Sequence, residues 1–152
     1  MKKYELTGEC KVYFGVTLRR IKSLIDFSDV KKGELGGFIE KEENLSHGGD
    51  AWVYGNARVS DNARVYDDAR VSGDARVSGN ADYVLIGRIG SRFGFTTFFR
   101  NKNNEIYVSC GCFLGTLAKF RKKVKETHGT DTKYAKVYQA AADLAEMQIL
   151  NK

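Results

Sequence analysis

The tripeptide Gly-Ser-Arg at positions 90–92 combines groups that recognise an anion. Within three residues it offers backbone N–H groups, the hydroxyl of Ser91 and the guanidinium of Arg92. Arginine holds a phosphate through two parallel hydrogen bonds, which makes Arg92 the strongest candidate for such a contact. The chemistry expected of this segment is therefore phosphate recognition.

Aromatic and cationic side chains surround this tripeptide. An exposed phenylalanine ring is a face on which a nucleobase stacks, although burial statistics favour the core for any single phenylalanine. Thr116 begins a predicted helix whose N-terminal amides are suited to phosphate. The predicted ligand-binding residues are Ser91, Arg92, Phe93, Phe95, Thr96, Thr97, Arg100, Thr116, Arg121 and Lys122.

The net charge of +6 is unevenly distributed along the 152 residues. Residues 83–152 contain twelve Lys or Arg and only five Asp or Glu, whereas the preceding segments are close to neutral. This distribution indicates an anionic partner for the carboxyl-terminal segment, and a solvated basic surface is the alternative interpretation.

A six-residue repeat occupies the middle of the chain. Each unit reads alanine, a polar residue, valine, which predicts a short strand with alanine and valine inward and the residue between them outward. Such a strand buries its apolar face only by stacking on its neighbours, as in a solenoid. Alanine lies at 51, 57, 63, 69, 75 and 81, valine at 53, 59, 65, 71 and 77, and the outward residues are Trp52, Arg58, Arg64, Arg70 and Arg76.

This period resembles the hexapeptide β-helix family, in which three hexapeptides form one triangular, left-handed coil. The resemblance implies that residue i stacks on residue i+18, so that Arg58 lies over Arg76 and Trp52 over Arg70. Many members of the family are acyltransferases with a histidine base between subunits. The two histidines here, His47 and His128, lie outside the regular repeat, which argues against an acyltransferase. An acyltransferase-like protein is the alternative function.

The predicted fold is mainly β with carboxyl-terminal helices, in three regions. Residues 1–38 form strands, with a hairpin at Gly15, that cap the solenoid or anchor it to another subunit. Residues 39–86 form the hexapeptide β-helix. Residues 87–152 form a basic ligand-binding module with a β-hairpin around "NKNN" and two helices, capped by Thr116 and Asp131.

The stretch "IGSR…TTFF…YVSCGCF.GTL..F...VKETHG" resembles the phage family of Thoeris anti-defence sponges. That resemblance implies a phage or prophage protein for immune evasion that sequesters cyclic nucleotide signals in the host cytoplasm without cleaving them. Cyclic ADP-ribose isomers such as gcADPR are the implied ligands, with cyclic oligonucleotides left open. It further implies a homo-oligomer, with a hexamer favoured, and a protein that is not an enzyme and has no cofactor.

Other features of the sequence bear on membrane, metal and nucleic-acid partners. No run of about 18 apolar residues or signal-peptide pattern is present, so we expect no membrane partner. The odd set of Cys10, Cys110 and Cys112 favours reduced thiols and argues against a disulfide framework or a metal site. No specific nucleic acid is expected. The open alternatives are a nonspecific nucleic-acid binder and a structural phage adaptor.

Overall fold

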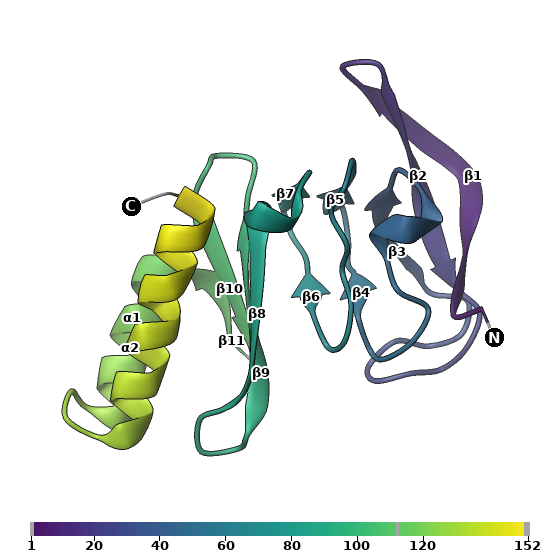
Figure 1. The fold of residues 1–152 in the computed structure, drawn as a ribbon. Helices are drawn as coiled ribbons and strands as arrows, with labels where there is room; N and C mark the ends of the chain where they lie inside the picture. Colours follow the sequence, from purple (N-terminus) through teal and green to yellow (C-terminus); the bar gives the residue numbers. More distant parts are fainter. Residues whose placement is uncertain (1, 112, 151–152) are drawn as a thin grey trace. The chain divides into compact units, whose positions relative to one another are not determined.

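The computed structural model describes residues 2–111 and 113–150, so that Cys112 lies outside the described residues. The chain divides into two compact units, Met1–Asn80 and Ala81–Lys152 (Figure 1). The first unit contains the solenoid, and the second contains a sheet and two helices. The predicted fold class, mainly β with carboxyl-terminal helices, is confirmed.

The first unit begins with a β-hairpin. Strands β1 (Tyr4–Tyr13) and β2 (Val16–Ser23) pair antiparallel, and β2 pairs with β3 (Leu35–Ile39). The sheet order is β1-β2-β3-β5-β7, which makes the hairpin continuous with one side of the solenoid. The hairpin thereby supplies hydrogen-bond partners to the first solenoid strand, whose edge is otherwise unpaired.

Parallel pairing between very short strands builds the solenoid. The strands are β4 (Trp52–Val53), β5 (Arg58–Val59), β6 (Arg70–Val71) and β7 (Arg76–Val77). Arg58 pairs with Arg76 and Trp52 with Arg70, which confirms the predicted spacing of eighteen residues.

The solenoid core consists of the repeated alanines and valines. The alanines from 51 to 75 and the valines from 53 to 77 are at most 1% exposed. Ala81 is exposed because it lies in the 3-10 turn η2 (Asn80–Asp82) and not in a strand. Trp52 is fully buried, contrary to the outward position predicted for it, because the ring of Phe27 packs edge-on against it at 5.2 Å.

The first coil differs from the coils that follow. Phe38 pairs with Arg58, and Leu45 pairs with Val65, so this coil spans twenty residues. The two additional residues lie between Leu45 and Trp52, because Leu45 pairs with Val65 whereas Trp52 pairs with Arg70. The 3-10 helix η1 (Glu42–Asn44) precedes them. Residues 38–57 are called the lead-in coil, and residues 58–75 the regular coil.

The second unit is a four-stranded antiparallel sheet with helices on one face (Figure 1). The order is β11-β10-β9-β8, and the predicted hairpin around "NKNN" is its β9–β10 pair. The strands are β8 (Tyr83–Ile89), β9 (Gly94–Arg100), β10 (Ile106–Cys110) and β11 (Phe113–Thr116), and the helices are α1 (Leu117–His128), α2 (Lys133–Ala145) and the π-helical η3 (Glu146–Leu150).

Threonine hydroxyls cap both α-helices. Thr116 accepts a hydrogen bond from the Lys119 N–H at 3.3 Å, as predicted. Thr132, and not Asp131, caps α2 by accepting from the Ala135 N–H at 3.1 Å. Across residues 2–111 and 113–150, no helix is both long enough and apolar enough to cross a membrane.

Candidate functional site

Three predicted ligand-binding residues lie together on the turn between β8 and β9. Ser91, Arg92 and Phe93 are all exposed, and Phe93 is 65% exposed with a positive φ of 50°. The Phe93 N–H donates to the Gly90 carbonyl at 3.2 Å, which closes the turn. This turn therefore presents a hydroxyl, a guanidinium and an aromatic ring to solvent.

Phe95, next along β9, contacts a cation of its own unit. Its ring is half-buried and lies 5.4 Å from the guanidinium carbon of Arg88. The ring crosses Gly87, where an added Cβ would lie only 2.2 Å from it. The Phe95–Arg88 pair is therefore a preformed cation–π contact beside the turn.

The three threonines predicted to bind ligand are engaged within the fold, two by burial and one by capping a helix. Thr96 and Thr97 are at most 2% exposed, and the Thr96 hydroxyl donates to the Cys110 sulfur at 3.2 Å. The Thr116 hydroxyl accepts the capping hydrogen bond of α1. Burial places both strand threonines out of reach of a ligand approaching from solvent.

Two predicted arginines hold parts of the second unit together. Arg100 donates to Asp82 at 2.8 Å, to Asn104 at 2.7 Å and to the Ile149 carbonyl. These bonds connect β9 to its neighbouring segments and occupy the guanidinium.

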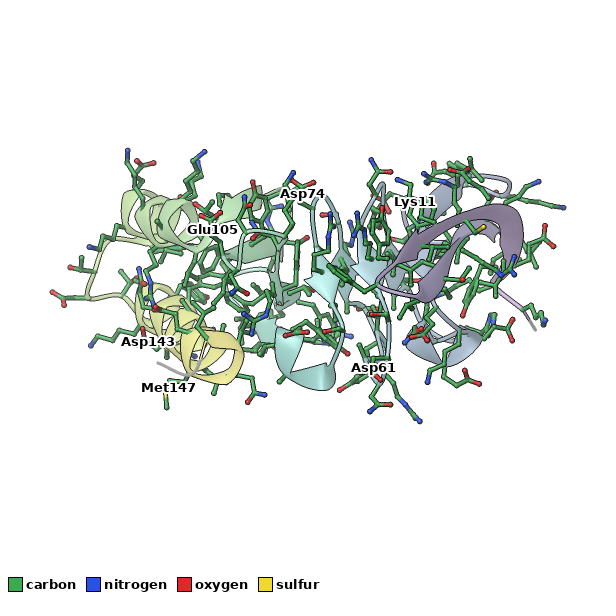
Figure 2. The ribbon with its side chains drawn as sticks, turned by 90° about the horizontal axis from the view of Figure 1, so that it is seen from above. Lys11, Asp61, Asp74, Glu105, Asp143 and Met147 are labelled. Carbon is green, nitrogen blue, oxygen red and sulfur yellow. The ribbon has the colours of Figure 1, made fainter. Side chains whose placement is uncertain are left out.

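Arg121 connects α1 to the carboxyl-terminal helices. It donates to Asp143 at 2.8 Å, and Figure 2 labels that carboxylate; it also donates to Glu146 at 2.6 Å. Burial alone would lower the pKa of Arg121, but these hydrogen bonds outweigh it and raise the pKa. Lys122 is exposed on α1. The ligand-binding assignment of the ten residues stays a prediction, with its exposed members on the 90–93 turn and on α1.

A second group of polar residues, absent from the sequence-based prediction, gathers on the lead-in coil. A pocket of about 490 Å³ lies between η1 and the next coil. Its polar lining consists of Glu42, Glu43, Ser46, His47, Arg64 and Tyr66. The only signal in the sequence is the break in the six-residue period before Ala51.

His47 has a defined orientation in this pocket. Its ring stacks on Tyr4 at 4.1 Å, with 11° between the planes. Its Nδ1 accepts the Lys3 backbone N–H at 3.1 Å, so the neutral imidazole carries its proton on Nε2. That Nε2 lies 3.7 Å from the Glu42 carboxylate. At this distance Nε2 makes no direct hydrogen bond to Glu42, and the same carboxylate oxygen lies 3.4 Å from the ammonium of Lys2.

The Tyr4 hydroxyl contacts two backbone carbonyls at the ends of η1. Its hydroxyl donates to the Leu45 carbonyl at 2.6 Å and lies 3.0 Å from the Glu42 carbonyl. Burial, followed by the charges of Glu42 and Glu43, raises the pKa of Tyr4. The tyrosine stays protonated and fixes the backbone that carries Glu42.

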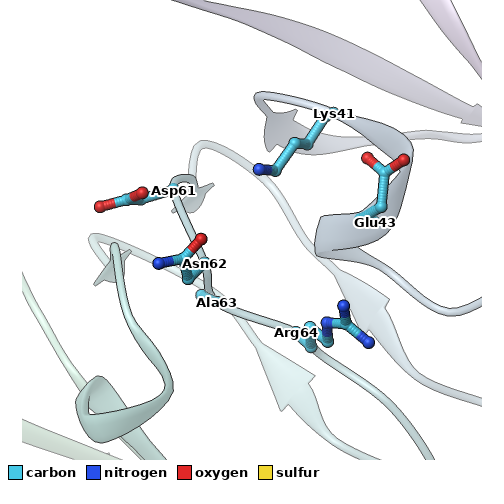
Figure 3. Close-up of a pocket in the computed structure, with 6 residues that line it drawn as sticks. All are labelled: Lys41, Glu43, Asp61, Asn62, Ala63 and Arg64. Atoms are coloured by element: carbon cyan, nitrogen blue, oxygen red, sulfur yellow. The ribbon is translucent and has the colours of Figure 1, made fainter.

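A smaller pocket of about 370 Å³ adjoins the first and shares Glu43 and Arg64 with it. Figure 3 shows its other residues, which are Lys41, Asp61, Asn62 and Ala63. The Asp61 N–H donates to the Glu40 carboxylate at 2.6 Å. The two pockets form a polar surface of mixed charge along one side of the solenoid.

The solenoid has known relatives. Its units match the YdcK β-solenoid repeat. The matched residues are 51–67, 57–73 and 69–81. The chain is also similar to a protein of Escherichia coli described as the uncharacterized acetyltransferase YdcK, with 36% identity over 62 residues. That similarity covers 36% of this chain and 19% of the relative.

This similarity overturns the prediction that the chain is not an enzyme. That prediction rested on the resemblance to the anti-defence sponges. The similarity to a protein named as an acetyltransferase points instead toward enzymatic activity.

Proposed function

We propose that the lead-in coil carries an acyl-transfer site of the hexapeptide-repeat acyltransferase type. The His47–Glu42 pair in the 490 Å³ pocket is the observation that carries this proposal. The similarity of the chain to a protein named as an acetyltransferase supports it.

We assign different roles to the two residues. The Lys3 N–H occupies Nδ1 of His47, and Nε2 bears the proton, so the imidazole is a donor here and not the base. Glu42, whose side chain is 43% exposed, is the proton acceptor, and His47 is a positioning residue for its carboxylate.

The proposed reaction transfers an acyl group from a thioester to an amine or hydroxyl. Glu42 takes the proton of the attacking amine or hydroxyl while the lone pair of that amine or hydroxyl attacks the thioester carbonyl. The carbon–sulfur bond then breaks, and the proton is passed to the departing thiolate. Arg64 lines the same pocket and supplies positive charge close to the developing oxyanion.

The test is incubation with acetyl-coenzyme A and a panel of amines and alcohols, with acylated products identified by mass spectrometry. Glu42→Gln is expected to lower the rate about 100-fold, and His47→Gln by less. Glu126→Gln, on an exposed part of α1, is the matched control. A wild-type rate no higher than the uncatalysed rate, or an unaffected Glu42→Gln variant, would contradict the proposal.

A second candidate function is sequestration of a cyclic nucleotide signal by the basic second unit. The exposed turn of Ser91, Arg92 and Phe93 favours it, because a hydroxyl and a guanidinium suit a phosphate and the ring suits a base. The resemblance to the anti-defence sponges supplies cyclic ADP-ribose isomers as ligands and a symmetric homo-oligomer, a hexamer, as the assembly.

Calorimetry at two salt concentrations tests this candidate. Arg92→Ala is expected to weaken binding by about 2 kcal/mol without changing thermal stability, and Arg92→Lys to restore little. Arg64→Ala, in the first unit, is the control. Stronger binding of linear nucleic acid with a steep salt dependence would replace this function with nonspecific binding. A mass of one chain in light scattering would refute the hexamer.

A further inference from the structure

The tip of the β1–β2 hairpin exposes apolar side chains that a stable fold does not need. Phe14 is fully exposed, at 106% of its reference area, and Val12 is 64% exposed. The part of β2 that pairs with β3 begins at Arg19, so residues 10–18 form a two-stranded ribbon that extends past β3 (Figure 1). The hydrophobic effect alone would disfavour these residues at this position.

Phe14 also has an unfavourable backbone conformation. Phe14 and Gly15 both have positive φ, 49° and 81°, as in the tight hairpin turns that favour Asn-Gly. A bulky side chain is rare at positive φ. A phenylalanine here is both strained and exposed, and strain of this kind gathers at functional sites.

The ribbon is held in place from behind. The guanidinium carbon of Arg58 lies 3.2 Å from the centre of the Tyr13 ring, and Leu18 is buried. Lys11, labelled in Figure 2, lies with its ammonium 4.8 Å from the centre of the Phe38 ring. The tip is therefore a supported projection of the first unit.

The charge of the ribbon identifies the surface that it fits. Residues 10–18 contain one cation, Lys11, and no carboxylate, and Arg19 follows them directly, whereas the next cation, Arg20, is paired with Glu9 at 3.0 Å. Lys11 is three residues from Phe14, which is about 10 Å along a strand. An interfacial segment buries its apolar side about 5–10 Å into the headgroup boundary while its cations meet anionic headgroups. Along the ribbon the apolar side chains lie at the tip and the cations lie behind them, which matches an apolar layer covered by anionic headgroups.

We propose that the hairpin tip is a peripheral contact for an anionic lipid surface, with Phe14 and Val12 entering the interface and Lys11 and Arg19 at the headgroups. This contact is independent of the acyl-transfer site, because its residues line neither pocket. The expectation of no membrane partner rested on the absence of a segment long enough to span a bilayer. A peripheral contact needs no such segment and therefore revises that expectation.

The test is cosedimentation of the full chain with vesicles of phosphatidylglycerol and, separately, of phosphatidylcholine. The wild type is expected to bind the anionic vesicles and to release them as salt rises. Phe14→Asn should lower the partition coefficient roughly tenfold while raising the melting temperature, because asparagine suits the turn. Phe14→Trp should bind and shift its emission to the blue.

Controls separate the tip from the basic second unit. Lys122→Gln with Lys123→Gln, on α1, should leave binding within about twofold, whereas Lys11→Gln with Arg19→Gln should weaken it. The proposal is overturned if the wild type does not sediment with phosphatidylglycerol, or if Phe14→Asn binds as the wild type does. It is also overturned if Phe14→Asn changes only the mass in light scattering, since the tip would then contact a second copy.

Discussion

The lead-in coil and the regular coil share one core but differ in what their turns contain. Both bury alanine and valine at the same depth. The regular coil repeats every eighteen residues, and its turns hold glycine, asparagine and aspartate. The lead-in coil takes twenty residues; it contains Glu42 in η1, and its two extra residues lie between Leu45 and Trp52, the segment that includes His47. A repeat thus provides the scaffold, and the coil that departs from it carries the pocket lined by Glu42 and His47.

One buried side chain, Asn44, holds the longer lead-in coil in place. Asn44 is fully buried, accepts the N–H groups of Glu40 and Lys41, and donates to the carbonyls of Asp61 and Ala63. One side chain therefore replaces the backbone pairing that a regular strand would have made.

The largest expected effect concerns the start of the lead-in coil. An added Cβ at Gly37 would lie 2.6 Å from the Ala57 carbonyl oxygen and 2.7 Å from Val53. Gly37→Val should lower the free energy of unfolding by about 4 kcal/mol, because the backbone at Ala57, at the end of the lead-in coil, must move. Denaturant titration measures this change. Gly8→Ala, where an added Cβ meets no atom within 4 Å, is the control and should change little.

Next in size is the loss of the Asn44 side chain. Asn44→Ala should cost about 3 kcal/mol, because four half-buried or buried backbone groups each lose a hydrogen bond, and of these the Glu40 N–H keeps a second one to the Val59 carbonyl. Asn62→Ala, at an exposed turn of the regular coil, is the matched control with an expected change below about 0.5 kcal/mol. Equal costs for the two variants in denaturant titrations would contradict the contrast between the coils.

A smaller effect depends on pH. Lys3 donates to the carbonyls of Gly49 and Ala51 in the lead-in coil, and burial, opposed by Asp50, lowers its pKa from 10.5 to about 8. Between these values the unfolded chain binds more protons, so stability should rise with pH, by about 2 kcal/mol.

Unfolding titrations at a series of pH values measure the rise, and Lys3→Met should abolish it. Above pH 10 the raised pKa of Tyr4 has the opposite sign, since the unfolded tyrosine ionises first and stability is lost. A flat profile in the wild type between pH 8 and 10 would show that Lys3 is not buried as a cation.

The smallest effect is expected at the stacked arginines Arg58 and Arg76 of the solenoid. Arg58 and Arg76 are register partners, and burial together with the charge of Arg76 lowers the pKa of Arg58. Arg76→Gln should change the free energy of unfolding by less than about 0.5 kcal/mol, because relief of repulsion offsets lost contacts. A loss above about 2 kcal/mol in thermal unfolding would mean that these arginines support the coil as strongly as Asn44 does.

Much of the fold was predictable because its signals are local and repeated. The alanine–valine period required an eighteen-residue stacking, and Thr116 is followed by a helical pattern that its hydroxyl caps. The burial of Trp52 was not predictable, because it depends on Phe27 folding over the solenoid from a distant segment. Asp131 and Thr132 are both good capping residues, so their order alone did not distinguish them.

The candidate site was less predictable than the fold. The turn that exposes Arg92 between β8 and β9 was not expected, since the predicted hairpin turn was at "NKNN". Residue type alone also could not show that Arg100 and Arg121 are occupied by carboxylates distant in sequence. The position of His47 beside Glu42 depends on the extra residues of the lead-in coil and on Lys3. Neither the arginine–carboxylate pairs nor the His47–Glu42 pair produces a repeated pattern in the sequence.

The triangular register constrains how the solenoid can change in length. Removing six residues from the repeat keeps every later alanine and valine inward, because the strand pattern has that period. Stacking, however, has a period of eighteen residues. Each later side chain would therefore move to the adjacent side of the prism, a rotation of about one third of a turn. Only the gain or loss of a whole coil preserves which side chains share a face, so viable length variants should differ by complete coils.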